Sequence, residues 1–369
     1  MVYKAIGLMS GSSLDGLDMA YVQFQETGGK WQYNIMHADC ILYTPEWKHQ
    51  LNRATSLLAA EYQLLHTAYG HYTGEQVNLF IDRHELHHKV DLVASHGHTT
   101  FHLPSKKMTA QLGDGAAIAA VTELPVVSDL RALDIAFGGQ GAPVVPIGEK
   151  LLFSEYDFLL NLGGIANITA QSQKEHIAFD VCPANRVLDL LAAHAGKEFD
   201  ENGTLASAGK PDERLLHELG NLEYYGWGYP KSLANDFGTE KVYPMIKAFS
   251  LSIPDALRTY TEHICNQVTA AISRLLHALP LPEITTGRKL LVTGGGAFNS
   301  FLILRLQDSL DKLGIKTEVP DKQLVNFKEA LVMALMGVLR WREEYNVLSS
   351  VTGAARNSIG GALWLGGEA

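Results

Sequence analysis

The stretch Gly7-Leu-Met-Ser-Gly-Ser-Ser-Leu-Asp-Gly-Leu-Asp18 directly follows an apolar strand at the start of the chain. Its glycines permit backbone angles closed to other residues and let main-chain N–H groups approach an anion, while its serines add hydroxyl donors. Asp15 and Asp18 would repel a bare phosphate, but a magnesium ion between carboxylate and phosphate removes that conflict. The stretch therefore indicates a phosphate-binding turn. An ordinary hairpin built from the same turn-forming residues is the alternative, and the Lys of a Walker P-loop is missing.

The composition favours a soluble protein of two domains that acts on small molecules. Of 369 residues, 46% are apolar and 19% are charged, which is enough to bury large cores. A net charge of -10 argues against nucleic-acid binding, because that role needs a basic face. Cys40, Cys182 and Cys265 are odd in number and widely spaced, which favours a reducing cytoplasm over a disulfide framework or a zinc cluster. The start of the chain lacks a signal-peptide pattern and no run of about 18 apolar residues occurs, so we expect neither secretion nor a membrane span.

Strand-like and helix-like segments alternate along the chain in two series, and each series opens with an apolar strand that runs into a glycine turn. The first turn is Gly7 to Gly16, and the second is Gly163-Gly164 after the strand that starts near Tyr156. Two related α/β halves are therefore predicted. The segment from Gly138 to Pro146 is rich in Gly and Pro, as a crossover between domains would be.

A second candidate phosphate clamp lies in Leu159-Leu-Asn-Leu-Gly-Gly-Ile-Ala-Asn-Ile-Thr169, where Gly163 and Gly164 form the bend and Asn167 follows it. Two such turns, one from each half, would hold a polyphosphate from both sides. Leu290-Leu-Val-Thr-Gly-Gly-Gly-Ala-Phe-Asn299 ends another buried-looking strand with Gly294, Gly295 and Gly296. These three glycines leave a backbone shelf on which an adenine could lie, and a simple tight turn is the alternative. The leucines that follow at helical spacing, from Leu302 to Leu313, are core positions, with Gly314 as the C-terminal cap.

Asp180 stands at the end of a predicted strand in Ala178-Phe-Asp-Val-Cys-Pro-Ala-Asn185, where open α/β sheets expose functional groups. Its carboxylate could accept a proton from an attacking oxygen. Alternatively, Asp180 caps the next helix, for which Asn185 is an equally good candidate.

Ser95-His-Gly-His-Thr-Thr-Phe-His102 presents three histidines at even spacing, which suggests either a zinc site or hydrogen bonds to a substrate or a loop. In the stretch from Ser128 to Pro143, Asp129, Arg131 and Asp134 precede a glycine run. Arg131 could bind a substrate carboxylate through two parallel donors, or the Asp–Arg pair could brace a turn. The candidate substrate-binding residues are His96, His98, Asp129, Arg131, Gln140 and Asn185.

The ordered set of these motifs, together with Ser-Val-Thr-Gly-Ala near Ser350, resembles the anhydro-N-acetylmuramic acid kinases from end to end. The resemblance implies the actin-like or sugar-kinase ATPase fold, a pair of ribonuclease-H-like α/β domains with a nucleotide in the cleft between them. We expect one domain over residues 1–128 plus about 350–369 and the other over 129–349. The implied reaction uses ATP, Mg²⁺ and water to open the 1,6-anhydro bridge of a cell-wall sugar and yields N-acetylmuramic acid 6-phosphate. A cytoplasmic homodimer with a small-molecule sugar substrate is also implied.

Carried onto matching positions, the resemblance makes Asp180 the base that activates water. It assigns ATP phosphate binding to the first turn, with Asp15 and Asp18 as metal ligands through water. The predicted nucleotide-binding residues are Gly11, Ser12, Ser13, Leu14, Asp15, Gly16, Leu17, Asp18, Gly163, Gly164, Asn167, Gly294, Gly295 and Gly296.

Several positions depart from the family pattern. Val181, Cys182 and Ala184 replace Thr, Gly and Gly after the proposed base, and His98 stands where Gln is usual. Pro-Lys-Ser at 230–232 continues as Leu-Ala-Asn-Asp at 233–236 instead of Thr-Gly-Arg-Glu, and Lys328 precedes Glu329 where an acidic or apolar residue is more familiar. These changes touch substrate-side segments more than nucleotide-side ones. A kinase of a different sugar or anhydrosugar, and a non-catalytic ATP-dependent regulatory protein, therefore stand as alternatives.

Overall fold

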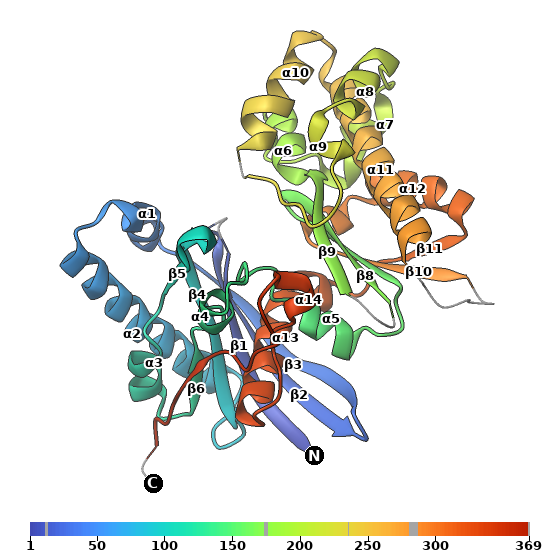
Figure 1. Ribbon diagram of the computed structural model, residues 1–369. Coiled ribbons are helices and arrows are strands. Elements are labelled where there is room, and N and C mark those ends of the chain that lie inside the picture. Colours follow the sequence, from blue (N-terminus) through green and yellow to red (C-terminus); the bar gives the residue numbers. More distant parts are fainter. Residues whose placement is uncertain (12–13, 173–175, 235, 280–286, 368–369) are drawn as a thin grey trace. The chain divides into compact units, whose positions relative to one another are not determined.

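The computed structural model describes residues 1–11, 14–172, 176–234, 236–279 and 287–367 (Figure 1). Two compact units are present: Met1–Phe153 with Phe327–Ala369, and Ser154–Asn326. The chain thus passes from one unit to the other at 153/154 and at 326/327. The sequence predicted these two crossovers between the units near 128/129 and 349/350.

Packing of two helices against the first unit explains this difference. Helix α5 (Pro146–Leu152) contacts β3 (Lys30–Leu42), so the chain does not leave the first unit at the Gly- and Pro-rich segment. Most of α13 (Lys322–Trp341) packs on the same sheet: a Cβ on Gly7 would lie 1.9 Å from the Ala330 carbonyl oxygen. Gly7 is therefore needed for close packing of strand and helix.

The first unit contains a seven-stranded sheet in the order β12-β6-β4-β1-β2-β3, with β5 paired to β4. Strands β1, β2 and β3 form an antiparallel meander, whereas β1, β4 and β6 run parallel. Alternate residues such as Ile6 and Leu8 point into one core, which is the period-two pattern of a sheet covered by helices. Besides β3, the strands are β1 (Val2–Ser10), β2 (Gly16–Thr27), β4 (Leu92–Leu103), β5 (Met108–Leu112), β6 (Val126–Ser128) and β12 (Ala362–Trp364).

The helices of the first unit pack closely where small residues meet. Gly70 and Gly74 of α2 leave no room for a Cβ against α3, because such an atom would lie 2.7 Å from Asp114 O and from Val121 Cβ, respectively. Besides α5 and α13, the helices are α1 (Pro45–Arg53), α2 (Ala59–Arg83), α3 (Gly115–Thr122), α4 (Ala132–Ala136) and α14 (Ser349–Thr352), with one-turn helices at Ala54–Ser56 and Pro104–Lys106.

The second unit repeats this topology in a five-stranded sheet, in the order β11-β10-β7-β8-β9. Strands β7, β8 and β9 form the antiparallel meander, and β7, β10 and β11 run parallel. Two copies of the same five-strand order confirm the predicted pair of ribonuclease-H-like α/β domains. The strands are β7 (Phe158–Leu162), β8 (Ile165–Gln171), β9 (His176–Pro183), β10 (Arg288–Thr293) and β11 (Ile315–Glu318).

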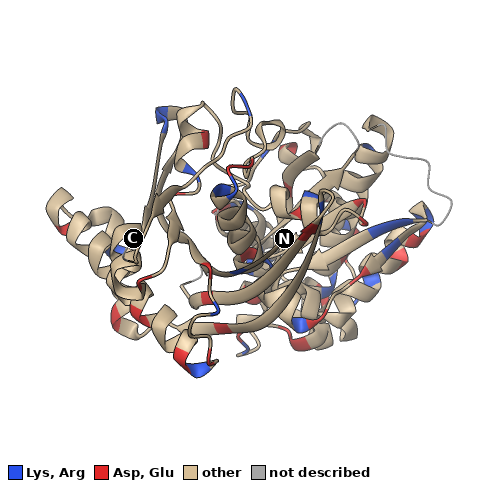
Figure 2. Cartoon of the chain, turned by 90° about the horizontal axis from the view of Figure 1, so that it is seen from below, with Lys and Arg blue, Asp and Glu red and all other residues tan. Residues whose placement is uncertain are grey.

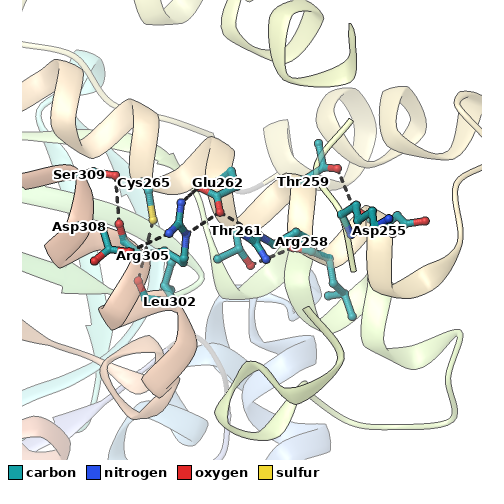
Figure 3. A network of polar contacts seen from close by, with 12 residues as sticks. Asp255, Arg258, Thr259, Thr261, Glu262, Cys265, Leu302, Arg305, Asp308 and Ser309 are labelled. Atoms are coloured by element: carbon teal, nitrogen blue, oxygen red, sulfur yellow. Dashed lines mark hydrogen bonds and ion pairs between the residues drawn. The ribbon is translucent and has the colours of Figure 1, made fainter. Parts of the chain in front are cut away.

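The longest helix of the second unit, α11 (Ile253–Ala278), contacts β9 and four other helices. Its start is capped by the Ser252 hydroxyl, which accepts a hydrogen bond from Asp255 N at 3.2 Å. Figure 3 shows how Glu262 joins α11 to α12, since it accepts from Arg258 Nε at 2.9 Å and from Arg305 Nε at 2.7 Å. The other helices are α6 (Asn185–Ala193), α7 (Thr204–Ala208), α8 (Glu213–Gly220), α9 (Glu223–Gly226), α10 (Tyr243–Ala248) and α12 (Ser300–Leu310), with one-turn helices at Glu201–Gly203, Gly295–Phe298 and Asp311–Leu313 and a π-turn at Phe237–Val242.

Two predictions about the segment after β10 are confirmed. Leu302, Leu306 and Leu310 are fully buried in the core of the second unit, and Leu313 packs against it. Gly314 ends the segment in the left-handed conformation, with φ 67°.

Lys and Arg residues and Asp and Glu residues both occur along much of the ribbon (Figure 2). No helix among the described residues combines the length and the apolar character that crossing a bilayer requires. The cysteines Cys40, Cys182 and Cys265 are all free.

Candidate active site

The turn between β1 and β2 is the first part of the candidate site. Ser12 and Ser13 lie outside the described residues. In the rest of the turn, Leu14 adopts a left-handed conformation with φ 58°, and its N–H lies 3.4 Å from Gly11 O. Gly7 and Gly16 lie in extended strands, so the expectation that they supply special backbone angles is wrong. A Cβ on Gly16 would lie 2.6 Å from Ile41 O, so this glycine permits a close approach of β3.

Two carboxylates lie beside this turn, and neither makes an ion pair with a described residue. Asp15 is exposed, whereas Asp18 is half-buried opposite Cys40 in the β2–β3 ladder. Burial raises the pKa of Asp18, a hydrogen bond with Cys40 opposes this rise, and the charges of Glu329 and Asp15 add to it. Three carboxylates therefore share one neighbourhood at the end of β1.

His98 is buried at the end of the first unit's sheet in a chain of hydroxyl groups. Its Nδ1 lies 2.9 Å from the Ser10 hydroxyl, which accepts from Tyr43 OH at 2.7 Å, and Tyr43 OH in turn bonds to Tyr69 OH. Burial lowers the pKa of His98 to about 4, so its ring is neutral at physiological pH. His98 thus fixes Ser10, the last residue of β1.

His96 is buried beside Arg131, whose Nε donates to His96 Nε2 at 2.8 Å. Burial, and secondarily the charge of Arg131, lowers the pKa of His96 to about 3. Burial lowers the pKa of Arg131 and the charge of Glu329 opposes that shift. The charge of Glu329, on α13, thus acts on both Arg131 and Asp18 and raises the pKa of each. Sequence reasoning missed this residue because it lies about 200 residues from Arg131 and about 310 from Asp18 in the chain, and no local spacing signals it.

The glycine run after Arg131 is held by Asp134, not by Asp129. Asp134 is fully buried and accepts from Gly141 N at 2.8 Å and from the Thr352 hydroxyl at 2.7 Å. Asp129 is exposed, with φ 56°, and accepts from the hydroxyl of its neighbour Ser128. Gln140 is exposed and its backbone N–H donates to Thr352 O at 2.8 Å.

The three histidines do not form a metal site. His102 bonds to the Thr109 hydroxyl at 3.2 Å, while His96 and His98 face Arg131 and Ser10. Across the described ranges of the chain, no three His, Cys, Asp or Glu side chains surround a common point that a metal ion could occupy. The structure thus supports the hydrogen-bonding interpretation of this motif over zinc.

The second unit places four polar residues in one row across its sheet. Thr293 pairs with Asn161, Asn161 with Asn167, and Asn167 with Asp180. Residues directly opposite one another on neighbouring strands share a face of the sheet. The flanking residues of β9, Phe179 and Val181, point to the other face and into the core. Asp180 and Asn167, both predicted from sequence, are therefore neighbours, and Asn161 and Thr293 are additions to the site.

Asp180 is half-buried and positioned by the segment that follows α9. Its Oδ2 accepts from Leu233 N at 2.8 Å, its N–H donates to Lys231 O at 3.3 Å, and Tyr224 OH donates to its carbonyl oxygen at 2.6 Å. Burial raises the pKa of Asp180, and the Leu233 hydrogen bond opposes this rise. The carboxylate does not cap α6, whose N-cap residue is Ala184. Sequence reasoning noted Pro-Lys-Ser at 230–232 only as a retained part of the family pattern and did not predict that this segment supports Asp180.

The glycine turns of the second unit divide into required and open positions. Gly294 has φ 82°, and a Cβ there would lie 2.4 Å from Asn161 Oδ1. Leu162 likewise leaves no room for a Cβ on Gly296. A Cβ on Gly295 would meet only Asn185 Nδ2, at 3.5 Å. Gly163 and Gly164 have room for a Cβ among the described residues. The fold therefore does not require glycine at 163, 164 or 295, which fits close approach of a ligand to this backbone.

Asn185 is tied to the protein itself. Its Nδ2 donates to Leu162 O at 2.9 Å, and its side chain lies against Gly295 and Gly296. It thus braces the end of β7 against the glycine turn after β10. A role in binding substrate, as the sequence suggested, stays a prediction.

The residues present fit magnesium and a nucleotide. Mg²⁺ is usually held by one or two carboxylates plus waters and substrate phosphates, so Asp15 and Asp18 suffice without a third protein ligand at one point. Backbone free of side chains at Gly163, Gly164 and Gly295 offers N–H groups to phosphates and a surface for a base.

The fold and the site define a protein of the two-domain α/β class with a fixed, half-buried carboxylate in the sheet of its second unit, and comparison with known proteins identifies its family. The family model described as Anhydro-N-acetylmuramic acid kinase matches residues 3–366, and the chain belongs to this family. A protein of that name from Pasteurella multocida is 31% identical over 97% of this chain and 96% of its own, and one from Salinibacter ruber is 33% identical over 97% and 95%. Among solved structures, the ADPNP-bound activator of 2-hydroxyisocaproyl-CoA dehydratase from Clostridium difficile aligns over 92% of this chain and 97% of that chain, with 13% identity and a TM-score of 0.43.

Most positions that depart from the family pattern have buried side chains or contribute only a backbone group near Asp180. Val181 and Cys182 are buried in the core of the second unit, and Ala184 is fully buried at the N-cap of α6. Leu233 contributes its backbone N–H to Asp180, which any residue except proline would do. These substitutions therefore leave the Asp180 support in place. Asn235 lies outside the described residues.

Proposed function

We propose that this protein is an ATP-dependent kinase that converts 1,6-anhydro-N-acetylmuramic acid to N-acetylmuramic acid 6-phosphate in cell-wall recycling. Family membership supports the activity and the sugar. The observation that carries the proposal is the half-buried Asp180 carboxylate, which a backbone N–H at 2.8 Å fixes in a polar row with Asn167 and Asn161.

Asp180 acts as the general base on water. Its raised pKa makes the carboxylate a stronger proton acceptor than an exposed aspartate. The water oxygen bonds to the anomeric carbon and its proton passes to Asp180, while the bond from that carbon to the bridging oxygen breaks. The freed oxygen at carbon 6 takes the γ-phosphoryl group, and ADP leaves. Asp15 and Asp18 would hold magnesium through water, and the ion would supply positive charge to neutralise the phosphates.

The remaining side chains position the reactants. Arg131, whose guanidinium is fixed by His96, is suited to a carboxylate such as the lactyl group of the sugar. The turns at Gly11–Asp18, Gly163-Gly164 and Gly294–Gly296 bind the nucleotide. The free cysteines support a reducing cytoplasm, and the family resemblance supports a homodimer, which sedimentation analysis would test.

Isotope labelling tests the reaction. The protein is incubated with 1,6-anhydro-N-acetylmuramic acid and ATP in ¹⁸O-water, and the product is analysed by mass spectrometry after rapid quenching. We expect a sugar 6-phosphate that carries ¹⁸O at the anomeric position. The amount of label should exceed the amount that authentic product gains by exchange with the same water in a parallel tube. A phosphorylated product without that label indicates a kinase that uses a sugar hydroxyl, and ATP hydrolysis without any sugar phosphate favours the regulatory alternative.

A further inference from the structure

A cavity of about 150 Å³ lies in the second unit between α11 and the segment after α9. Phe179 and Val181 line it from β9, so it lies on the face of the sheet opposite the Asp180 carboxylate. Tyr225, Trp227 and Tyr229 supply aromatic walls, and Trp227 and Tyr229 are 50% and 41% exposed. The cavity therefore has an aromatic rim that is open to solvent.

Two cations line the same cavity without an acidic partner. Lys231 Nζ donates to Tyr224 O at 3.1 Å and lies 4.4 Å from the centre of the Tyr224 ring. Arg274 Nη1 donates to Tyr225 O at 2.7 Å. Neither side chain forms an ion pair with any residue of the described ranges, whereas Arg258 and Arg305 of the same unit both pair with Glu262. Each cation is thus held in place by a carbonyl oxygen and keeps further N–H donors.

The electrostatics of the cavity favour an anion. Burial, followed by the charge of Arg274, lowers the pKa of Lys231 to about 8, with Cys182 opposing. A bound oxyanion would remove the repulsion between the two cations. Hydrogen bonds from Lys and Arg to an oxyanion are charge-assisted, and Arg presents two parallel donors to carboxylate or phosphate. The aromatic rim suits a small ring attached to that group.

We propose that this cavity binds the oxyanion of a small metabolite, a carboxylate or a phosphate on a ring of about monosaccharide size. The segment from Tyr224 to Leu233 also holds Asp180 through Tyr224 OH, Lys231 O and Leu233 N, so occupancy changes the position of that carboxylate. This second part, an effect on catalysis, rests on the proposed function, whereas binding itself does not.

Titration of the full-length protein tests the binding, followed by tryptophan fluorescence and calorimetry in the absence of ATP. The probes are glucose 6-phosphate, glucuronate and the neutral control glucose. We expect saturable binding of at least one charged probe and none of glucose. Which charged probe binds distinguishes a phosphate from a carboxylate ligand, and either result supports the site.

Variants assign the binding to this cavity. Arg274→Gln and Lys231→Gln are each expected to raise the Kd by about 10-fold or more. Lys247→Gln is the matched control, since Lys247 also lies over a tyrosine ring, 5.6 Å from the centre of Tyr243, but outside the cavity. Arg274→Lys keeps the charge and retains part of the affinity, which separates loss of binding from loss of folding.

Three results would overturn the site: no saturable binding of either charged probe, binding of glucose as tight as that of the charged sugars, or unchanged Kd values in both cavity variants. In a kinase assay, the charged probe should change the turnover of the wild type but not that of Arg274→Gln. If the protein binds the probe and shows no kinase activity, the site stands and the proposed function fails.

Discussion

At the residue scale, buried neutral histidines make the stability of the first unit depend on pH. His96 and His98 are 3% and 6% exposed, with pKa values lowered to about 3 and about 4. An unfolded chain protonates both near pH 6.5, so the unfolded state binds more protons than the native state below that pH. The stability is therefore complete above about pH 6.5 and declines as the pH falls toward 4.

The variant His98→Gln tests this dependence. Glutamine can keep a hydrogen bond to the Ser10 hydroxyl but has no proton to gain. Each histidine costs about 1.4 kcal/mol per pH unit below 6.5, so at pH 5 the wild type loses about 2 kcal/mol at this residue. At pH 7.5 we expect the variant to unfold at the same denaturant concentration as wild type or at a lower one. At pH 5 the free energy of unfolding of the variant should rise relative to that of wild type by about 2 kcal/mol. Parallel pH profiles for the two proteins would contradict a neutral buried His98.

Asp180 has the opposite linkage. Its pKa is raised, so ionising it costs the folded state free energy above the folded pKa, and that cost is absent below the pKa of the unfolded chain. Asn at position 180 can still accept from Leu233 N. We expect Asp180→Asn to melt at the same or a higher temperature than wild type at pH 7, to bind nucleotide normally, and to lose most turnover.

The same shift sets the acid limb of the activity profile. Because the base must be deprotonated, kcat/KM should decrease as the pH is lowered. The midpoint of this decrease should lie above the ordinary aspartate pKa of about 3.9. Calorimetric melting, nucleotide titration and a product assay on purified Asp180→Asn check these outcomes. Asn161→Asp, in the same polar row of the sheet, is measured beside it as a second variant. Undiminished phosphorylation by Asp180→Asn would refute the assigned base.

At the scale of elements, a buried ion pair fastens α13 to α5. Lys328 Nζ lies 3.0 Å from Glu149 Oε1, both side chains are almost fully buried, and Glu149 Oε2 has no partner among the described residues. Both residues lie within five positions of the chain crossovers between the units. Removing one partner of such a pair leaves an uncompensated charge in the protein interior.

Lys328→Met is therefore expected to destabilise the first unit by about 3–5 kcal/mol. The double variant Lys328→Met/Glu149→Met should recover most of that loss, because no isolated charge remains. Lys316→Met is the matched control: its ion pair with Glu318 has the same 3.0 Å distance but the lysine is 72% exposed, so the loss should stay below about 1 kcal/mol. Equal losses in the buried and exposed variants, measured by guanidinium unfolding, would contradict this account.

At the scale of the whole molecule, each unit carries candidate functional residues of its own. The first supplies the carboxylates of the β1–β2 turn and the Arg131–His96 pair, and the second supplies Asp180 and the open glycine turns. The two sheets share one topology. The proposed reaction assigns the magnesium carboxylates to the first unit and the base to the second.

The magnesium dependence of turnover should respond to changes in the first unit. Asp18→Ala and Asp15→Ala each remove a carboxylate that fits the ion, so the Mg²⁺ concentration for half-maximal turnover should rise by about 10-fold or more. Asp82→Ala, which removes an exposed carboxylate on α2, is the control. Identical magnesium titration curves for both turn variants and wild type would rule out this role.

Local sequence determined the glycine turns after β7 and β10, the core leucines of α12 and the α/β alternation, because periodicity and turn chemistry act over a few residues. The predicted strand end at Asp180 is wrong, since β9 runs on to Pro183. Tertiary structure decided the rest. The domain crossovers depend on which sheet α5 and α13 cover. Glu329 comes near Arg131 and Asp18 in the first unit, and Leu233 reaches Asp180 and Thr293 reaches Asn161 in the second, only because segments distant in sequence meet within each unit. Gly7 and Gly16 illustrate the physical reason: each is a glycine because another segment packs within 3 Å of its Cβ position, and such a contact has no signature within the segment itself.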